Sequence, residues 1–163
     1  MRSASGSIDL SGLDGPVRIE TASGAVDARN LHGSTIISTA SGGIRMANIS
    51  GDLQVTSVSG GIAGAGVNRV SNAYSTSGAI NLTGDFATNA EIGSTSGSIM
   101  LRFTPAASVR IDATSLSGDV SAADLGLTGQ VTGPHALSGS IGNSGPTVSI
   151  YTTSGSIRLQ RGS

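Results

Sequence analysis

The hydrophobic residues of this chain recur at a fixed distance from a repeated Ser-Gly pair. The pair stands at residues 5-6, 23-24, 41-42, 59-60, 77-78, 96-97, 117-118, 138-139 and 154-155. The first five copies are separated by 18 residues, and the later intervals are 19, 21, 21 and 16 residues. A period of this length predicts a stack of similar structural units.

Each unit is predicted to contain a β-strand directly after its Ser-Gly pair. The second residue after the glycine is β-branched and apolar in every copy, namely Ile8, Val26, Ile44, Ile62, Ile80, Ile99, Val120, Ile141 and Ile157. A second column of mostly apolar residues follows two positions later, with polar residues such as Asp9 and Arg45 in between. Apolar residues at a spacing of two predict a strand with one buried face.

A corner and a second strand complete the predicted unit. The corner has an apolar column at Leu13, Leu31, Ile49 and Val67, preceded by Gly12, Asn30, Asn48 and Gly66 and followed by Gly15, Gly33 and Gly51. Glycine and asparagine tolerate positive φ, so both flanking columns are predicted to be left-handed turn positions. The second strand has its inward column at Ile19, Ile37, Val55 and Ala73.

The register loosens after about residue 83. Extra residues stand around 83–86, 103–107 and 125–129, whereas apolar strand patterns continue at 90–92, 109–113, Val131 and 148–150. A solenoid accepts insertions at its corners because lengthening a surface loop costs little closure entropy. We therefore expect longer corners in this half, with the strands retained.

The predicted fold is all-β, a single-stranded parallel β-helix (β-solenoid) with about 18–21 residues per coil, forming one domain over residues 1–163. Parallel crossovers are normally right-handed, and so is the expected coil. Strand spacing gives eight or nine coils a length of roughly 40 Å. Both termini fall inside the repeat pattern, so no capping unit is predicted. Either flanking segments of a longer protein cover the two ends, which is the favoured interpretation, or the strands at residues 8–10 and 157–159 leave open ends through which copies join into a homo-oligomer or filament.

Composition narrows the function classes. Aromatic residues make up 2% of the chain, with no Trp, so the core must be thin and aliphatic. Nine arginines balance ten acidic residues without a basic cluster, which disfavours nucleic-acid binding. The absence of Cys excludes disulfides and thiolate metal sites. No apolar run approaches the ~20 residues of a transmembrane segment, and no export signal is recognised in this chain.

The repeated serine, from Ser23 to Ser154, is the first candidate for chemistry. A nucleophilic serine needs a base within hydrogen-bonding reach, and the only histidines are His32 and His135, about six coils apart. A serine that recurs nine times before a glycine is better explained as a turn-forming hydroxyl. A glycosidase would need paired carboxylates at a cleft, which the sequence does not indicate. No catalytic residue and no enzymatic activity are predicted.

Two further patterns suggest ligands only superficially. Residues 61–66 resemble a phosphate-binding loop but lack its strand-to-helix context, and Arg69 replaces the last glycine of a dinucleotide fingerprint. Asp9 and Asp27 are expected to stand one above the other, yet a Ca²⁺ site needs six or more oxygen ligands. Solvated carboxylates screened by Arg29 or Arg45 are the expected arrangement. No cofactor and no metal site are predicted.

A column of small hydroxyls offers an alternative function. Two residues before the serine of the repeat stand Thr21, Thr39, Ser57, Ser75, Ser94 and Thr152. If this ladder faced solvent on a flat sheet, the solenoid could bind ice or a glycan.

The Thr-x-Ser-Gly-x-Ile/Val repeat, together with residues 103–113, resembles the DUF4097 family, whose members are regarded as adhesins built from β-strand repeats. The resemblance covers nearly the whole chain, although this sequence lacks Lys and has fewer acidic residues than typical members. It implies a non-catalytic structural or adhesive β-solenoid of a bacterial cell envelope or extracellular protein. The partners that it implies are an envelope protein or glycan, rather than nucleic acid.

Overall fold

The computed structural model describes residues 1–123, 125–128, 133–143 and 145–162, which form 17 β-strands and no helix. No helix within these ranges is long and apolar enough to cross a membrane. The strands are β1 (Arg2–Ser5), β2 (Ile8–Leu13), β3 (Val17–Ser23), β4 (Val26–Leu31), β5 (Thr35–Thr39), β6 (Ile44–Ile49), β7 (Leu53–Ser57), β8 (Ile62–Val67), β9 (Val70–Ser75), β10 (Ile80–Gly84), β11 (Ala90–Ser94), β12 (Ile99–Phe103), β13 (Val109–Ser115), β14 (Val120–Ala123), β15 (Ala136–Ile141), β16 (Thr147–Thr152) and β17 (Ile157–Arg161).

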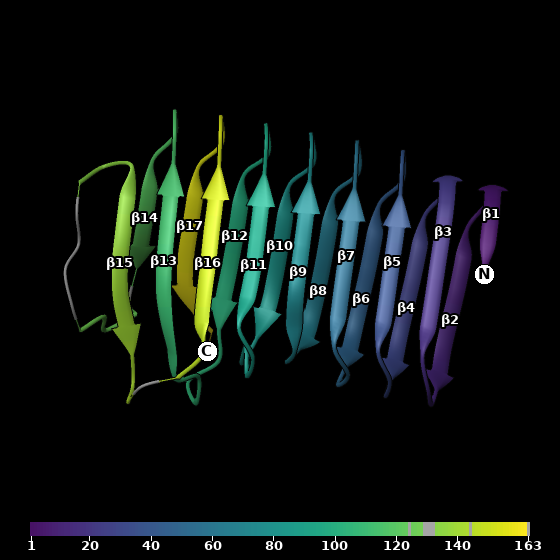
Figure 1. The fold of residues 1–163 in the computed structure, drawn as a ribbon, viewed down its shortest axis with the longest axis horizontal. Coiled ribbons are helices and arrows are strands. Elements are labelled where there is room, and N and C mark those ends of the chain that lie inside the picture. The colour runs from purple at the N-terminus through teal and green to yellow at the C-terminus, as the bar shows by residue number, and fades with distance from the viewer. Residues whose placement is uncertain (124, 129–132, 144, 163) are drawn as a thin grey trace.

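The strands alternate between two sheets that face each other. The nine-stranded sheet has the order β1-β3-β5-β7-β9-β11-β16-β13-β15, and the eight-stranded sheet has the order β14-β17-β12-β10-β8-β6-β4-β2. In Figure 1 the parallel strands of the first sheet point upward in front, those of the second point downward behind, and the chain advances toward the left. This combination is a right-handed coil, so the predicted parallel β-solenoid is confirmed.

The core is the space between the two sheets, and the predicted columns fill it. Ile44 is 1% exposed, and its column neighbours Val26 and Ile62 are completely buried. The strand pairing aligns Val26 with Ile44 and Ile44 with Ile62, so like residues stack directly on one another. The inward column of the second strand, which includes Ile19 and Ile37, is also buried. Each coil therefore adds one aliphatic layer to a continuous core.

The last coil of the chain does not lie at the end of the rod. Strand β16 pairs with β11 on one side and β13 on the other, and β17 lies likewise between β12 and β14. Residues 157–159 are thus internal and buried at both Ile157 and Leu159, so the prediction that they form an open end is wrong. Figure 1 shows this coil in yellow between green and teal strands of earlier coils.

Of the longer corners in the second half of the chain, one spans the last coil and another buries an aromatic side chain. Three residues, 14–16, join β2 to β3, whereas five residues, 104–108, join β12 to β13 and span the position that the last coil fills. The corner between β10 and β11 also has five residues, 85–89. It buries Phe86 completely, with its ring centroid 5.2 Å from that of Phe103. The insertions expected around 83–86 and 103–107 therefore serve packing and topology.

One predicted coil is instead a cap. Ser138 and Gly139 lie inside β15, which pairs antiparallel with β13 and aligns Ile141 with Val109. The outer side of β15 is met by Thr128, whose N–H and carbonyl both bond to Ser140 at 2.9 Å. The prediction of a turn at 138–139, and of a rod without a cap, is wrong for this end. The strand expected at Val131 lies outside the described residues.

The opposite end of the rod is formed by β1 and β2. Among the described residues β1 pairs only with β3, and β2 pairs only with β4. Ile8 is buried, but Leu13 is 39% exposed and Met1 is 67% exposed. The rod is thus asymmetric, with strand edges open at the purple end of Figure 1 and a cap at the green end.

The inserted coil leads to a prediction about stability. A chain that ends after Pro146 lacks the strands that join β13 and β14 to the rest of the rod. We expect backbone amides of residues 109–141 to lose hydrogen-exchange protection, whereas those of β3 to β10 keep theirs.

Deletion of residues 1–13 is the matched control, because it also removes a coil but should leave 109–141 protected. Retained protection of 109–141 in the shorter chain would show that β13 can pair directly with β11.

Candidate functional surface

The Ser-Gly turns bring successive coils into backbone contact. A Cβ added to Gly42 would lie 2.0 Å from the carbonyl oxygen of Gly24, and one added to Gly24 would lie equally close to Gly6. In one corner column the predicted left-handed turn is wrong for Gly33 and Gly51, which are instead restricted by the same kind of backbone contact. Gly15 has a φ of 108°, but Gly33 has no positive φ and is restricted by the Gly15 carbonyl oxygen at 2.0 Å. These glycines are structural.

The other corner column behaves as predicted. Gly12, Asn30, Asn48 and Gly66 all have positive φ, between 52° and 64°. The two asparagines also bond to each other, since Asn48 Nδ2 donates to Asn30 Oδ1 at 3.0 Å. This polar ladder supports the corner from outside while the adjacent Leu31 fills the core.

The column of small hydroxyls faces inward. Ser57 and Ser75 are fully buried, and their Oγ atoms accept hydrogen bonds of 2.9 Å from the amides of Gly60 and Gly78. Ser94 and Ser115 make the same bond to the glycine three residues later. These four serines stabilise their turns from within, whereas Thr21 and Thr39 are buried without a hydrogen-bond partner for their hydroxyls in the described part of the chain. Because the column is buried, the prediction that it could present a flat ladder to ice or glycan is wrong.

The remaining sequence candidates are not assembled into a site. His32 Nδ1 lies 3.1 Å from Asp14 Oδ1 at a corner, and His135 Nδ1 lies 2.8 Å from the Gly118 carbonyl oxygen at the capped end. Neither histidine has a hydrogen bond to a serine among the described residues. Asp9 stacks on Asp27 as predicted, and Asp27 pairs with Arg29 at 2.6 Å.

Two ligand patterns are also explained structurally. Residues 62–67 form strand β8, so the glycine-rich stretch that begins at Gly61 is a strand rather than a phosphate loop. The described ranges contain no group of three or more His, Cys, Asp or Glu side chains able to hold a metal ion.

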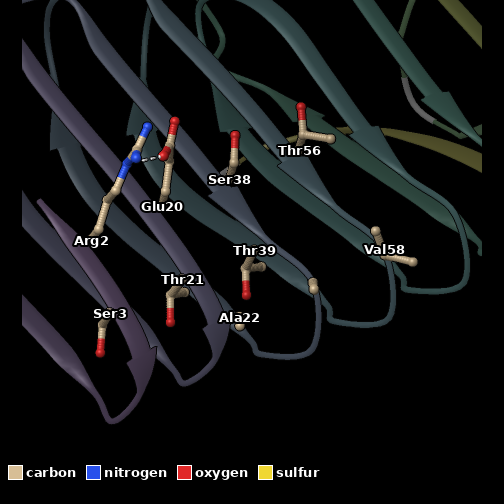
Figure 2. Close-up of a pocket in the computed structure, with 10 residues that line it drawn as sticks. Arg2, Ser3, Glu20, Thr21, Ala22, Ser38, Thr39, Thr56 and Val58 are labelled. Atoms are coloured by element: carbon tan, nitrogen blue, oxygen red, sulfur yellow. Dashed lines mark ion pairs between the residues drawn. The ribbon is translucent and has the colours of Figure 1, made fainter.

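A shallow groove crosses the outer face of the nine-stranded sheet near its N-terminal end. Figure 2 shows the residues that line it, from β1 to the turn after β7, with Glu20, Ser38 and Thr56 in one cross-strand row. Arg2 Nε lies 2.6 Å from Glu20 Oε2, and Arg18 contacts the other oxygen at 2.6 Å. The hydrogen bond from Arg18 is the main cause that lowers the pKa of Glu20. The only charges in the groove are thus paired at its rim.

Beyond this rim the centre of the same face carries no charge. The outward side chains of β5, β7 and β9 are uncharged, and they are Ile36, Ser38, Gln54, Thr56, Asn72 and Tyr74. The eight-stranded sheet differs, because Arg45, Arg102 and Arg158 are exposed on its outer face. Period-two alternation with the inward Ile37 and Val55 was sufficient to identify the outward positions, but no motif marked them as functional.

Comparisons with known proteins identify the family. The family model described as Toastrack DUF4097 matches residues 1–160. The comparison with curated proteins gave no match. The comparison with solved structures also gave none.

The backbone contact at the turns can be tested by paired substitutions. Gly42→Val places side-chain atoms against the Gly24 carbonyl, which is backbone and cannot easily move, so we expect a loss above about 3 kcal/mol in the free energy of unfolding. The exposed neighbour provides the control, since Ser41→Ala should change stability by less than about 0.5 kcal/mol. Denaturant unfolding measures both, and the reverse ranking would show that the turn hydroxyl is the required group.

Proposed function

Because the chain belongs to the Toastrack DUF4097 family, we propose that it is a non-catalytic structural or adhesive module of a bacterial envelope or extracellular protein. The repeated polar residues support a structural role, since Ser57, Ser75 and their equivalents are used to close turns. His32, His135 and Asp27 lie in separate ion pairs or backbone contacts, which supports a role without catalysis.

The observation that carries an adhesive role is the outer face of the nine-stranded sheet. It is a continuous sheet, parallel from β1 to β13, whose central outward residues, such as Ser38 and Thr56, are small or neutral. Such a face has few charges to desolvate when it meets another extended surface. Its rigidity also lowers the conformational entropy lost on binding. A flat, neutral and rigid face fits attachment to an envelope polymer or protein.

Co-sedimentation with purified bacterial cell walls and with outer-membrane vesicles tests this function. We expect saturable binding to at least one of them, without release of soluble products from it. The variant Gln54→Arg/Thr56→Arg places two positive charges on the exposed side of β7 in the neutral face and should weaken binding by about tenfold.

Ala63→Arg is the matched control, because Ala63 is exposed on the eight-stranded sheet and its replacement should leave binding unchanged. If the chain bound saturably to neither cell walls nor vesicles, an adhesive role would be contradicted. Accumulation of reducing ends during incubation would contradict a role without catalysis.

A second candidate function is self-assembly through one end of the rod, in place of the head-to-tail growth expected from the sequence. Among the described residues the edges of β1 and β2 carry no cap, whereas the other end has the antiparallel β15 on one sheet and β14 as the last strand of the other. Two copies that join through the same edge form a two-fold, closed pair, so this route gives dimers rather than filaments. The expectation of head-to-tail growth through residues 157–159 is not retained, because those residues are internal.

A proline at the open edge tests this pairing. The Ile8 amide donates to Ala25, so the amide of the next residue, Asp9, points toward the open edge in a parallel ladder. Asp9→Pro should therefore abolish dimers and leave the monomer folded, whereas Asp9→Ala should retain them. Light scattering over a concentration series measures both, and a parent chain that stays monomeric throughout would rule out the assembly.

A further inference from the structure

The exposed aromatic side chains of the chain gather at one place. The chain has two tyrosines, two buried phenylalanines and no tryptophan. Tyr74 on β9 and Tyr151 on β16 both lie on the outer face of the nine-stranded sheet, on either side of β11. Their ring centroids are 6.4 Å apart, with an angle of 39° between the ring planes. The two rings are brought together only because the last coil is inserted beside β11.

Gly93 on β11 lies between the two tyrosines. The strand register aligns Tyr74 with Gly93 and Gly93 with Tyr151, so the three residues form one cross-strand row. A Cβ on Gly93 would lie 2.4 Å from Tyr151 Cζ, which means that the Tyr151 ring lies low over the glycine. Tyr74 leans toward the same strand, and its hydroxyl is 2.8 Å from Thr95 Oγ1. The result is an aromatic platform of two mutually tilted rings on the sheet.

A polar recess adjoins this platform along β9, β11 and β16. It is lined by Ser71, Asn89, Glu91, Thr147 and Ser149. Asn89 Oδ1 accepts a hydrogen bond of 2.9 Å from the Thr147 amide, which fixes one wall. Glu91 is exposed and aligns with Ser149 on the next strand, and it has no ion pair among the described residues. A carboxylate and several neutral polar groups therefore lie within one or two residues of the rings.

We propose that Tyr74, Gly93 and Tyr151 form a binding platform for a neutral glycan of glucose-configured pyranose units, with Glu91 and Ser149 bonding its hydroxyls. A pyranose with equatorial hydroxyls presents flat C–H faces, which pack on aromatic rings, and a rim of hydroxyls, which bond to carboxylates and alcohols. The Glu91 carboxylate disfavours acidic sugars. The proposal rests on the adhesive function and assigns its ligand class.

The strand register places the recess and the platform next to each other. Glu91 and Gly93 are two residues apart on β11, and their partners on β16 are Ser149 and Tyr151. The pKa of Tyr151 is raised, mainly because burial desolvates its hydroxyl and also because the nearby carboxylate of Glu91 disfavours the phenolate. A ligand that packs on the rings therefore lies beside the carboxylate as well.

Binding of cellohexaose, a neutral glucose oligomer, tests the proposal. The chain has no tryptophan, so its intrinsic emission comes from Tyr74 and Tyr151 and reports directly on the platform. We expect a saturable change of tyrosine emission and a matching calorimetric titration. Tyr151→Ala should weaken binding by about tenfold, and Glu91→Gln by about threefold.

Gly93→Ala separates ligand binding from a merely structural tyrosine pair. Its methyl group displaces the Tyr151 ring without removing an aromatic residue, and alanine is no worse than glycine in a strand. We expect about a tenfold loss of cellohexaose affinity with an unchanged melting temperature. Met100→Ala, on the outer face of the other sheet, should leave affinity unchanged.

Three outcomes overturn the proposal. They are no saturable response to cellohexaose at millimolar concentrations, equal affinity for an oligogalacturonate of the same length, and wild-type affinity of both Tyr151→Ala and Gly93→Ala. Co-sedimentation with cell walls is measured on the same samples. If that binding persists without a cellohexaose response, the platform assignment fails and the adhesive function stands. If both are absent, the function fails as well.

Discussion

The close backbone contact between successive Ser-Gly turns is the constraint on which the whole rod depends. At Gly24 and Gly42 the neighbouring carbonyl oxygen occupies the space of a Cβ, so any larger residue would separate the coils. The closeness keeps every strand at hydrogen-bonding distance from the next one. It also buries the glycine amides, and side chains such as Ser57 and Ser75 then satisfy them from inside. The glycine at each turn and the inward serine that bonds to its amide in four of the coils are thus explained by one contact.

Because the stacking depends on the turns and the inward residues, the outward residues of the two sheets are free to vary. The repeat determines the inward residues and the turns, whereas the outward positions of the sheets contribute little to the stacking. The outer face of the nine-stranded sheet is neutral at its centre and aromatic near β11, where Tyr74 and Tyr151 lie beside Gly93. The eight-stranded sheet instead exposes arginines such as Arg102. Differences in recognition are therefore expected between faces rather than between coils.

The sequence was sufficient to predict the coil but not the order of the coils. Burial of Ile44 and positive φ at Asn30 follow from local patterns, because alternation and turn chemistry act within one repeat. Nothing local distinguishes Ile157 from Ile99, since each coil presents the same aliphatic edge, and so the insertion of the last coil could not be deduced. Ser138-Gly139 was misassigned because its residues match the repeat while their strand runs antiparallel. The tyrosine platform was missed because it depends on that insertion.

The position of the last coil also has a consequence for how the protein is made. A ribosome releases β13, β14 and β15 before β16 and β17. The strand that β13 pairs with on its rod-facing side is β16, and the strand that β14 pairs with is β17, so both partners emerge later. During synthesis strands β1 to β12 can stack in order, while β13 to β15 have no paired strand beside β11 and β12 until β16 and β17 emerge. A chain interrupted between β15 and β16 consequently leaves the edges of β11 and β12 unpaired in mid-rod, where a protease or chaperone can recognise them. Closure of this gap thereby reports that translation has passed β17.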